Sequence, residues 1–146
     1  MDHIVYLDYK AKELENLKLG KKSMIVRGAM GRKVPYGRVA KNDTLYFVEN
    51  KGDLLAKAKA KVEEVFFTSK LTREDSFSLI DKYQSRLLLN TALKKRYAGK
   101  RYLTLIKLKE FVAFEYPFSI DLSQISNMDD WFIVNEIDTV MVKQEV

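Results

Sequence analysis

The chain has no cysteine among its 146 residues and a single histidine, His3. The absence of cysteine excludes disulfides, Cys-ligated zinc, iron–sulfur clusters and thiol catalysis, and it agrees with a reducing compartment. One histidine excludes His-rich metal sites and argues against a Ser-His-Asp triad. The chain also has no uncharged apolar run of membrane-spanning length, and its N-terminus lacks a basic flank followed by such a run. We therefore expect a soluble, cytoplasmic protein that needs no membrane, metal or cofactor.

Low-complexity tracts, repeats and proline-rich linkers are also missing, and the only prolines are Pro35 and Pro117. A hydrophobic content of 47% in 146 residues is enough to build one core. We therefore predict a single domain over residues 1–146. Within it, residues 116–146 form an acidic and apolar C-terminal extension.

Charge is distributed unevenly along the chain. The formal net charge is +6, but residues 1–109 carry 25 Lys and Arg against 12 Asp and Glu, whereas residues 110–146 carry one lysine and eight acidic side chains. A basic body of this kind attracts polyanions such as nucleic acids. An acidic segment that packs beside a solvated basic surface would explain the same asymmetry, so charge alone leaves both interpretations open.

The pattern of β-formers predicts a mixed α+β fold. Strands are expected over residues 3–7, 23–27, 44–48 and 101–111, with one more at 118–122 and a mixed end at 131–142. Between a hairpin turn and Phe67, alanines alternate with lysines, which predicts a strand with one lysine-rich face and a bulge at residues 63–65. About five or six short strands would then close a small barrel-like sheet with helices at its ends.

Three helices are expected from their capping signals. Asp8 is a candidate N-cap for a helix that runs through Lys18, and Gly20 can end it in the left-handed conformation. The capping-box pattern that begins at Thr72 predicts a helix near Ser76, and Asn90 begins a further helical segment. The loop at residues 28–42 that follows the second strand contains three glycines, Pro35 and four basic residues.

The segment from Gly20 to Arg27, with the sequence GKKSMIVR, resembles the ASCH motif Gly-x-Lys-x-x-Glu-x-Arg of the PUA-like superfamily. Gly20, Lys22 and Arg27 match the motif, whereas Ile25 stands where the glutamate is expected. The order of elements over residues 10–110 is also similar, from the helix before the motif to the late strand with the sequence YLTLI.

The resemblance implies a small PUA-like β-barrel with a cleft between the barrel and its helices that binds RNA or a nucleobase. Some small members of the family are hydrolases of a modified nucleoside or of RNA. They use the motif lysine, a polar side chain at the position of Ile25, and a glutamate on a later strand, for which Glu63 or Glu64 is the candidate here. An isoleucine neither transfers a proton nor attacks a carbonyl, and this departure weakens the hydrolase interpretation.

The residues themselves also predict a binding cleft. In a strand, Ser23, Ile25 and Arg27 share one face, and the planar guanidinium of Arg27 suits a phosphate or a guanine edge. Tyr36 lies among the basic residues of the loop, where an aromatic ring can stack on a base. The predicted nucleic-acid-binding residues are Lys22, Arg27, Arg32, Lys33, Tyr36 and Arg38.

Each candidate also has a purely structural interpretation. Arg27 would form a salt bridge with Glu63 or Glu64, and Tyr36 would anchor its loop. Ile25 and Trp131 would lie in the core. The three lysines of the alternating strand would form an ordinary solvated face; they are Lys57, Lys59 and Lys61.

Three functions remain in competition. The first is a non-catalytic module that binds RNA or a modified nucleotide in a basic cleft. The second is a small nucleoside amidohydrolase or ribonuclease that uses Lys22 with Glu63 or Glu64, with Ser23 as the only nearby hydroxyl. The third is a protein-interaction domain whose apolar segment at residues 131–142 binds a partner protein, or binds a second copy of the chain to form a homodimer.

Overall fold

The computed structural model describes residues 1–123 and 129–142. The helices are α1 (Glu13–Lys18), α2 (Arg73–Leu87) and α3 (Thr91–Tyr97), and a short 3-10 helix covers Ile137–Thr139. None of the described helices has the length and apolar character needed to span a membrane. The strands are β1 (Asp2–Leu7), β2 (Met24–Ala29), β3 (Thr44–Glu49), β4 (Leu55–Phe67), β5 (Tyr102–Ser119) and β6 (Trp131–Val134).

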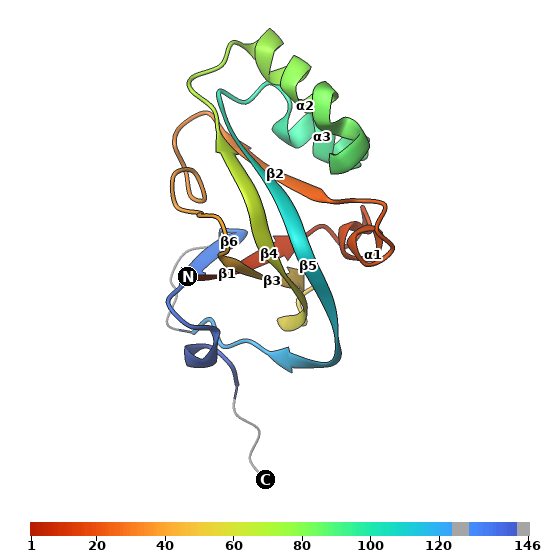
Figure 1. Cartoon of the computed structure of the whole chain (residues 1–146), viewed down its shortest axis with the longest axis vertical. Helices are drawn as coiled ribbons and strands as arrows, with labels where there is room; N and C mark the ends of the chain where they lie inside the picture. Colours follow the sequence, from red (N-terminus) through yellow and green to blue (C-terminus); the bar gives the residue numbers. More distant parts are fainter. Residues whose placement is uncertain (124–128, 143–146) are drawn as a thin grey trace.

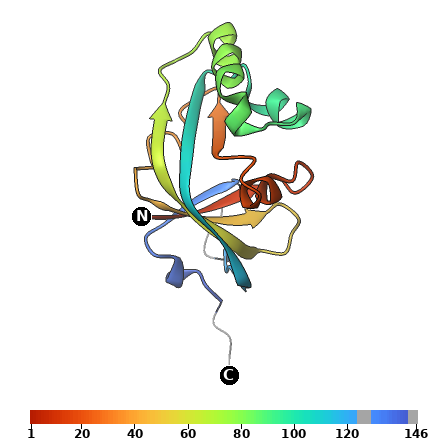
Figure 2. The same ribbon diagram turned by 45° about the vertical axis from the view of Figure 1, so that its right-hand side comes forward.

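The six strands form one mixed sheet in the order β2-β5-β4-β3-β1-β6. β1 and β3 are parallel, and the other neighbours are antiparallel. The long strands β4 and β5 run along the molecule while β1, β3 and β6 cross them, so the sheet curls into a half-barrel (Figure 1). Figure 2 shows α2 and α3 at one end of the long strands and the 3-10 helix at the other. The predicted α+β class with about six strands and flanking helices is confirmed.

The curvature of the sheet arises at irregular points of pairing between β4 and β5. The register shifts three times along this pair, including between Val62 and Glu64, where the sequence predicts a bulge. Ala58, Ala60 and Val62 are buried while Lys59 and Lys61 are exposed. The alternation therefore forms a strand with one lysine-rich face, as predicted.

Capping explains where the helices begin. The Thr72 side chain accepts a hydrogen bond from the Asp75 N–H at 3.1 Å, and the Asn90 side chain accepts one from the Leu93 N–H at 2.9 Å. The first helix is shorter than the predicted span of residues 8–18. The Asp8 side chain accepts a hydrogen bond from the Ala11 N–H at 2.8 Å and so caps a single turn. Lys12 then takes a left-handed conformation with φ 56°, which interrupts the helix. The helix consequently begins at Glu13.

The core consists of three clusters that meet at the sheet. β2 contributes to two of them, because alternate side chains point to opposite faces of a strand. Ile25 lies inside the half-barrel with Phe47 and Trp131, whereas Met24 and Val26 pack against α2 and α3. Ile25 is fully buried, as its structural interpretation predicts.

The C-terminal segment is part of the sheet. β5 continues to Ser119, so residues 118–122 do not form the separate strand that the sequence suggests; Ile120 instead makes an isolated bridge with Met141. β6 pairs with β1 and buries Trp131, the predicted core anchor. The mixed end expected at residues 131–142 contains β6 and the short 3-10 helix. The pairing of β6 with β1, more than 120 residues away in the sequence, is set by tertiary contacts.

A polar network lies inside the half-barrel beside Trp131. His3 is fully buried; its Nε2 lies 2.8 Å from the Asp43 carboxylate, and the Trp131 indole N–H donates to its Nδ1 at 3.0 Å. Since Nδ1 accepts a hydrogen bond, the imidazole is neutral with its proton on Nε2. Burial lowers the pKa of His3 from its ordinary 6.5, although Asp43 opposes this effect.

We expect this network to make the fold less stable in mild acid. Because the pKa of His3 is lowered in the folded state, the unfolded chain binds the proton first. The stability that neutral His3 contributes is complete above about pH 6.5 and is lost as the pH falls below that value. Burial alone would raise the pKa of Asp43, but its bonds to His3 and Ala40 lower it overall, so this carboxylate stays ionised in the same range.

Urea unfolding between pH 5 and pH 7.5 measures this effect. His3→Gln keeps a side-chain donor for Asp43 but does not titrate, so its free energy of unfolding should depend less on pH than that of the parent. Equal slopes for the two proteins would show that His3 does not cause the acid sensitivity.

Candidate functional site

A cleft opens where the half-barrel is incomplete, between β2 on one side and β1 with β6 on the other. Two adjoining cavities of about 410 and 460 Å³ make up the cleft. We call the first cavity the basic half, because Lys33 and Lys100 line it and not the other. We call the second the acidic half, because Asp8 and Glu13 line it and not the first. Five lining residues are common to both halves: Arg27, Arg96, Tyr97, Asp129 and Asp130.

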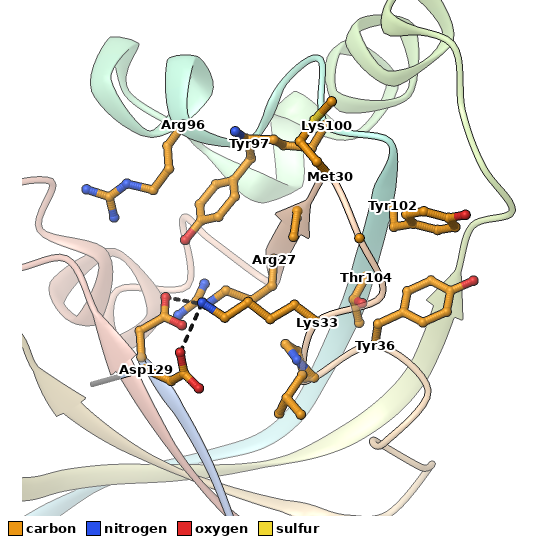
Figure 3. Close-up of a pocket in the computed structure, with 16 residues that line it drawn as sticks. Arg27, Met30, Lys33, Tyr36, Arg96, Tyr97, Lys100, Tyr102, Thr104 and Asp129 are labelled. Carbon is orange, nitrogen blue, oxygen red and sulfur yellow. Dashed lines mark ion pairs between the residues drawn. The ribbon is translucent and has the colours of Figure 1, made fainter. Parts of the chain in front are cut away.

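Figure 3 shows the basic half and the elements that form it. The end of β2 and the following loop supply one wall, and the start of β5 supplies another. The end of α3 and the turn after it bring Arg96, Tyr97 and Lys100 to the cleft, while Asp129 and Asp130 arrive from the chain just before β6. The site therefore depends on segments that are far apart in sequence.

Arg27 connects the two sides of the opening. Its guanidinium donates to the Tyr6 carbonyl of β1 and, at 2.8 Å, to the carbonyl of Val26. Its Nε lies 3.2 Å from the Asp130 carboxylate without making a hydrogen bond there or with any other residue of the described ranges. The predicted salt-bridge partners Glu63 and Glu64 are wrong, because both are exposed on the far part of β4 and Glu64 pairs with Lys107.

The surroundings of Arg27 keep it charged although only 5% of it is exposed. Its guanidinium lies 5.8 Å from the ring centre of Tyr97 and 5.7 Å from that of Trp131. Burial alone would lower the pKa of Arg27, but Tyr97, Asp130 and Glu13 raise it overall. Arg27 is thus a fixed positive charge that forms part of both halves of the cleft.

The loop after β2 places only some of its predicted residues in the cleft. Lys33 is 60% exposed and pairs with Asp129 at 3.0 Å. Tyr36 lines the basic half, but its hydroxyl donates to the Thr68 carbonyl and its ring packs on Phe67 and Tyr102. Tyr36 therefore anchors the loop and forms the cleft wall at the same time.

Arg32 and Arg38 are exposed, and neither lines either half of the cleft. The guanidinium of Arg32 lies over the ring of Tyr102, 5.5 Å from the ring centre. The Arg38 N–H closes a local backbone turn with the Pro35 carbonyl at 2.9 Å. The number of basic residues in the loop does not show which of them line the cleft, because the packing of the loop sets the direction of each side chain.

Sequence reasoning missed most of the opposite wall. Arg96 and Lys100 flank Tyr97 at the end of α3, and the basic run before Gly99 was the available signal. Asp129 and Asp130 had no local signal beyond the acidic character of the C-terminal segment. Their ion pairs with Lys33 and Arg27 do show that part of the acidic segment packs against the basic body.

Comparison with solved structures finds the same architecture. The crystal structure of the ASCH protein from Zymomonas mobilis superposes with a TM-score of 0.66 at 14% identity, covering 94% of this chain and 90% of that one. Two single-substitution mutants of that protein superpose equally well. The chain has the ASCH fold. No protein-family model matches it, and no curated protein matches it in sequence.

Within the ASCH fold, the motif lysine of this chain is internal. Lys22 is only 2% exposed, lies 3.3 Å from the Glu13 carboxylate and also donates to the Leu87 carbonyl. Burial lowers the pKa of Lys22, Glu13 opposes this, and the charge of Arg27 lowers it further. Lys22 does not line either half, whereas Glu13 lines the acidic half. The structure thus places Lys22 behind the cleft and not within it.

The catalytic arrangement considered from the sequence is not assembled. Glu63 and Glu64 are exposed and line neither half, and Ile25 occupies the motif's glutamate position inside the core. The partner that the fold gives to Lys22 is Glu13, on α1. The position of Lys22 after the left-handed Gly20, with φ 75°, turns it toward that helix.

We expect Arg27→Ala to lower the free energy of unfolding by about 2–4 kcal/mol, because it removes a buried cation that Asp130 and two carbonyls face. Arg38→Ala is the matched control and should change stability by less than about 0.5 kcal/mol, since Arg38 is exposed. Urea titration monitored by circular dichroism measures both. Equal small losses would show that Arg27 is not the connection between the two sides.

Proposed function

We propose that the cleft binds single-stranded RNA, with a phosphate group in the basic half. The observation that carries this proposal is the convergence of Arg27, Lys33, Arg96 and Lys100 with an aromatic wall in one cavity of the ASCH fold. These cations come from two segments of the chain, residues 27–33 and 96–100, so their proximity is a product of the fold. A cavity of about 410 Å³ falls in the range that holds a small ligand.

Lys33 and Arg96 are the cations best placed to meet a phosphate. Both are more than half exposed, and their ion pairs with Asp129 and Asp8 are solvated contacts at 3.0 and 3.9 Å. Such pairs stabilise the protein by at most about 1 kcal/mol, so an incoming phosphate can replace the carboxylate at little cost. Arg27 stays fixed behind them and supplies a permanent positive charge.

Tyr36 and Tyr102 supply the surface on which a base can pack. Their rings meet edge to face at 5.4 Å and form one side of the basic half. Aromatic side chains beside cations are the usual means by which proteins hold single-stranded RNA without a fixed sequence. Lys22, Arg32 and Arg38 have no direct part in this proposal.

The two alternative functions receive less support. The hypothesis of a protein-interaction domain requires an exposed apolar segment at residues 131–142. Four apolar side chains of this segment are instead buried against the half-barrel, namely Trp131, Phe132, Val134 and Ile137. The hydrolase reading requires a polar residue at position 25 and a glutamate beside Lys22 in the cleft. Ile25 is core, and Lys22 lies behind the cleft wall.

Binding of short single-stranded RNA should be salt-dependent and should centre on the basic half. If about three phosphates are neutralised, log K should fall with log[salt] with a slope of about −2. Lys33→Ala and Arg96→Ala should each weaken binding about 3- to 10-fold and make the slope shallower. Fluorescence anisotropy at several salt concentrations measures both quantities.

Lys59→Ala and Lys61→Ala are the matched controls, because these lysines are exposed on the sheet away from the cleft. They should change affinity by less than about 2-fold, through diffuse attraction alone. The proposal fails if RNA does not bind at low salt, or if the control variants lose as much affinity as the cleft variants.

A further inference from the structure

The two halves of the cleft carry opposite charge. Of the charged side chains that line only one half, Lys33 and Lys100 belong to the basic half and Asp8 and Glu13 to the acidic half. The remaining charged lining residues are common to both. A ligand with an anionic end and an end that donates hydrogen bonds is therefore complementary to both halves.

We propose that the acidic half is a base pocket that selects nucleotides whose base carries an exocyclic amino group, with Asp130 as the acceptor. This inference rests on the proposed function, because it takes the phosphate of the same RNA to be in the basic half. It assigns to Asp130 a role in specificity that no motif or comparison assigns.

The walls of the acidic half suit a planar base. Leu54 from the β3–β4 turn, Leu122 and Phe132 line it together with the rings of Tyr6 and Tyr97. Apolar and aromatic walls with few polar groups are characteristic of small-ligand pockets. The cavity of about 460 Å³ adjoins the basic half along Arg27 and Asp130.

Arg27 brings one unsatisfied buried donor to this boundary, beside the Asp130 carboxylate. It is 5% exposed, lines both halves, and its Nε makes no hydrogen bond within the described part of the chain. Buried donors are seldom left without an acceptor. A small reorientation of Asp130, which already lies 3.2 Å away, would satisfy this donor when the pocket is filled.

Asp130 is the carboxylate best able to accept from a base. Glu13 is engaged by Lys22 and by the Asp8 N–H at 2.8 Å, and Asp8 accepts from the Ala11 N–H. Asp129 pairs with Lys33 in the basic half. The Asp130 side chain is 45% exposed, and its ion pair with Arg27 at 3.2 Å engages one oxygen.

This acceptor distinguishes cytosine from uracil. Cytosine presents an N4 amino donor where uracil presents an O4 carbonyl, which a carboxylate repels. Adenine presents an amino donor as well. A metal ion is a poorer occupant, since no three His, Cys, Asp or Glu side chains in the described residues are arranged to hold one.

The test uses the whole chain and fluorescein-labelled RNA tetramers of cytidine, adenosine and uridine, titrated by anisotropy at low salt. We expect the cytidine and adenosine tetramers to bind about 3- to 10-fold more tightly than the uridine tetramer. The cytidine and uridine pair carries the test, because these bases have the same size. Asp130→Asn should reduce this preference at least 2-fold, because an amide offers the uracil O4 a donor.

Asp129→Asn is the matched control and should keep the preference for cytidine, since Asp129 faces Lys33. Urea unfolding identifies any variant that has lost its fold. If no tetramer binds, the proposed function itself fails. If all three bind equally, or if Asp129→Asn and Asp130→Asn lose the preference to the same extent, RNA binding stands and the base pocket is rejected.

Discussion

A single buried guanidinium connects the two sides between which the half-barrel opens. The order of strands leaves β2 and β6 at opposite ends of the sheet, with β1 beside β6. Arg27 reaches from β2 to the Tyr6 carbonyl on β1 and to the Asp130 carboxylate just before β6. An arginine suits this position because its planar fork serves several acceptors at once and remains charged when buried. The same contacts that hold the opening also define the floor of the cleft.

The position of this charge determines what surrounds it. Asp130 and Asp129 approach from the acidic C-terminal segment, and they form ion pairs with Arg27 and Lys33. Tyr97 and Trp131 cover the guanidinium from α3 and β6. Packing of the C-terminal segment is thus inseparable from formation of the cleft, and the charge asymmetry of the sequence becomes a short-range contact.

The motif that suggested the family divides into structural and cleft-forming positions. Gly20 turns the chain after α1, Lys22 is held by Glu13 behind the cleft, and Ile25 belongs to the core. Only Arg27 of the motif reaches the cleft surface. The alternation along β2 explains why Ile25 and Arg27 share the interior of the half-barrel: the first lies where the interior is closed, and the second where it opens.

Sequence patterns alone predict the α+β class, the strands around residues 3–7, 44–48 and 55–67, and the helix starts at Thr72 and Asn90. These features depend on local chemistry, namely β propensity, alternation and capping. The sequence also identified Arg27, Lys33 and Tyr36, all of which line the cleft. It could not separate them from Lys22, Arg32 and Arg38, because residue type does not tell which way a side chain points. The contact of Asp130 with Arg27, and the placement of Arg96 and Lys100 in one cavity with Lys33, follow from long-range packing. Those pairs join segments 60 or more residues apart, and their approach depends on how the whole sheet curls.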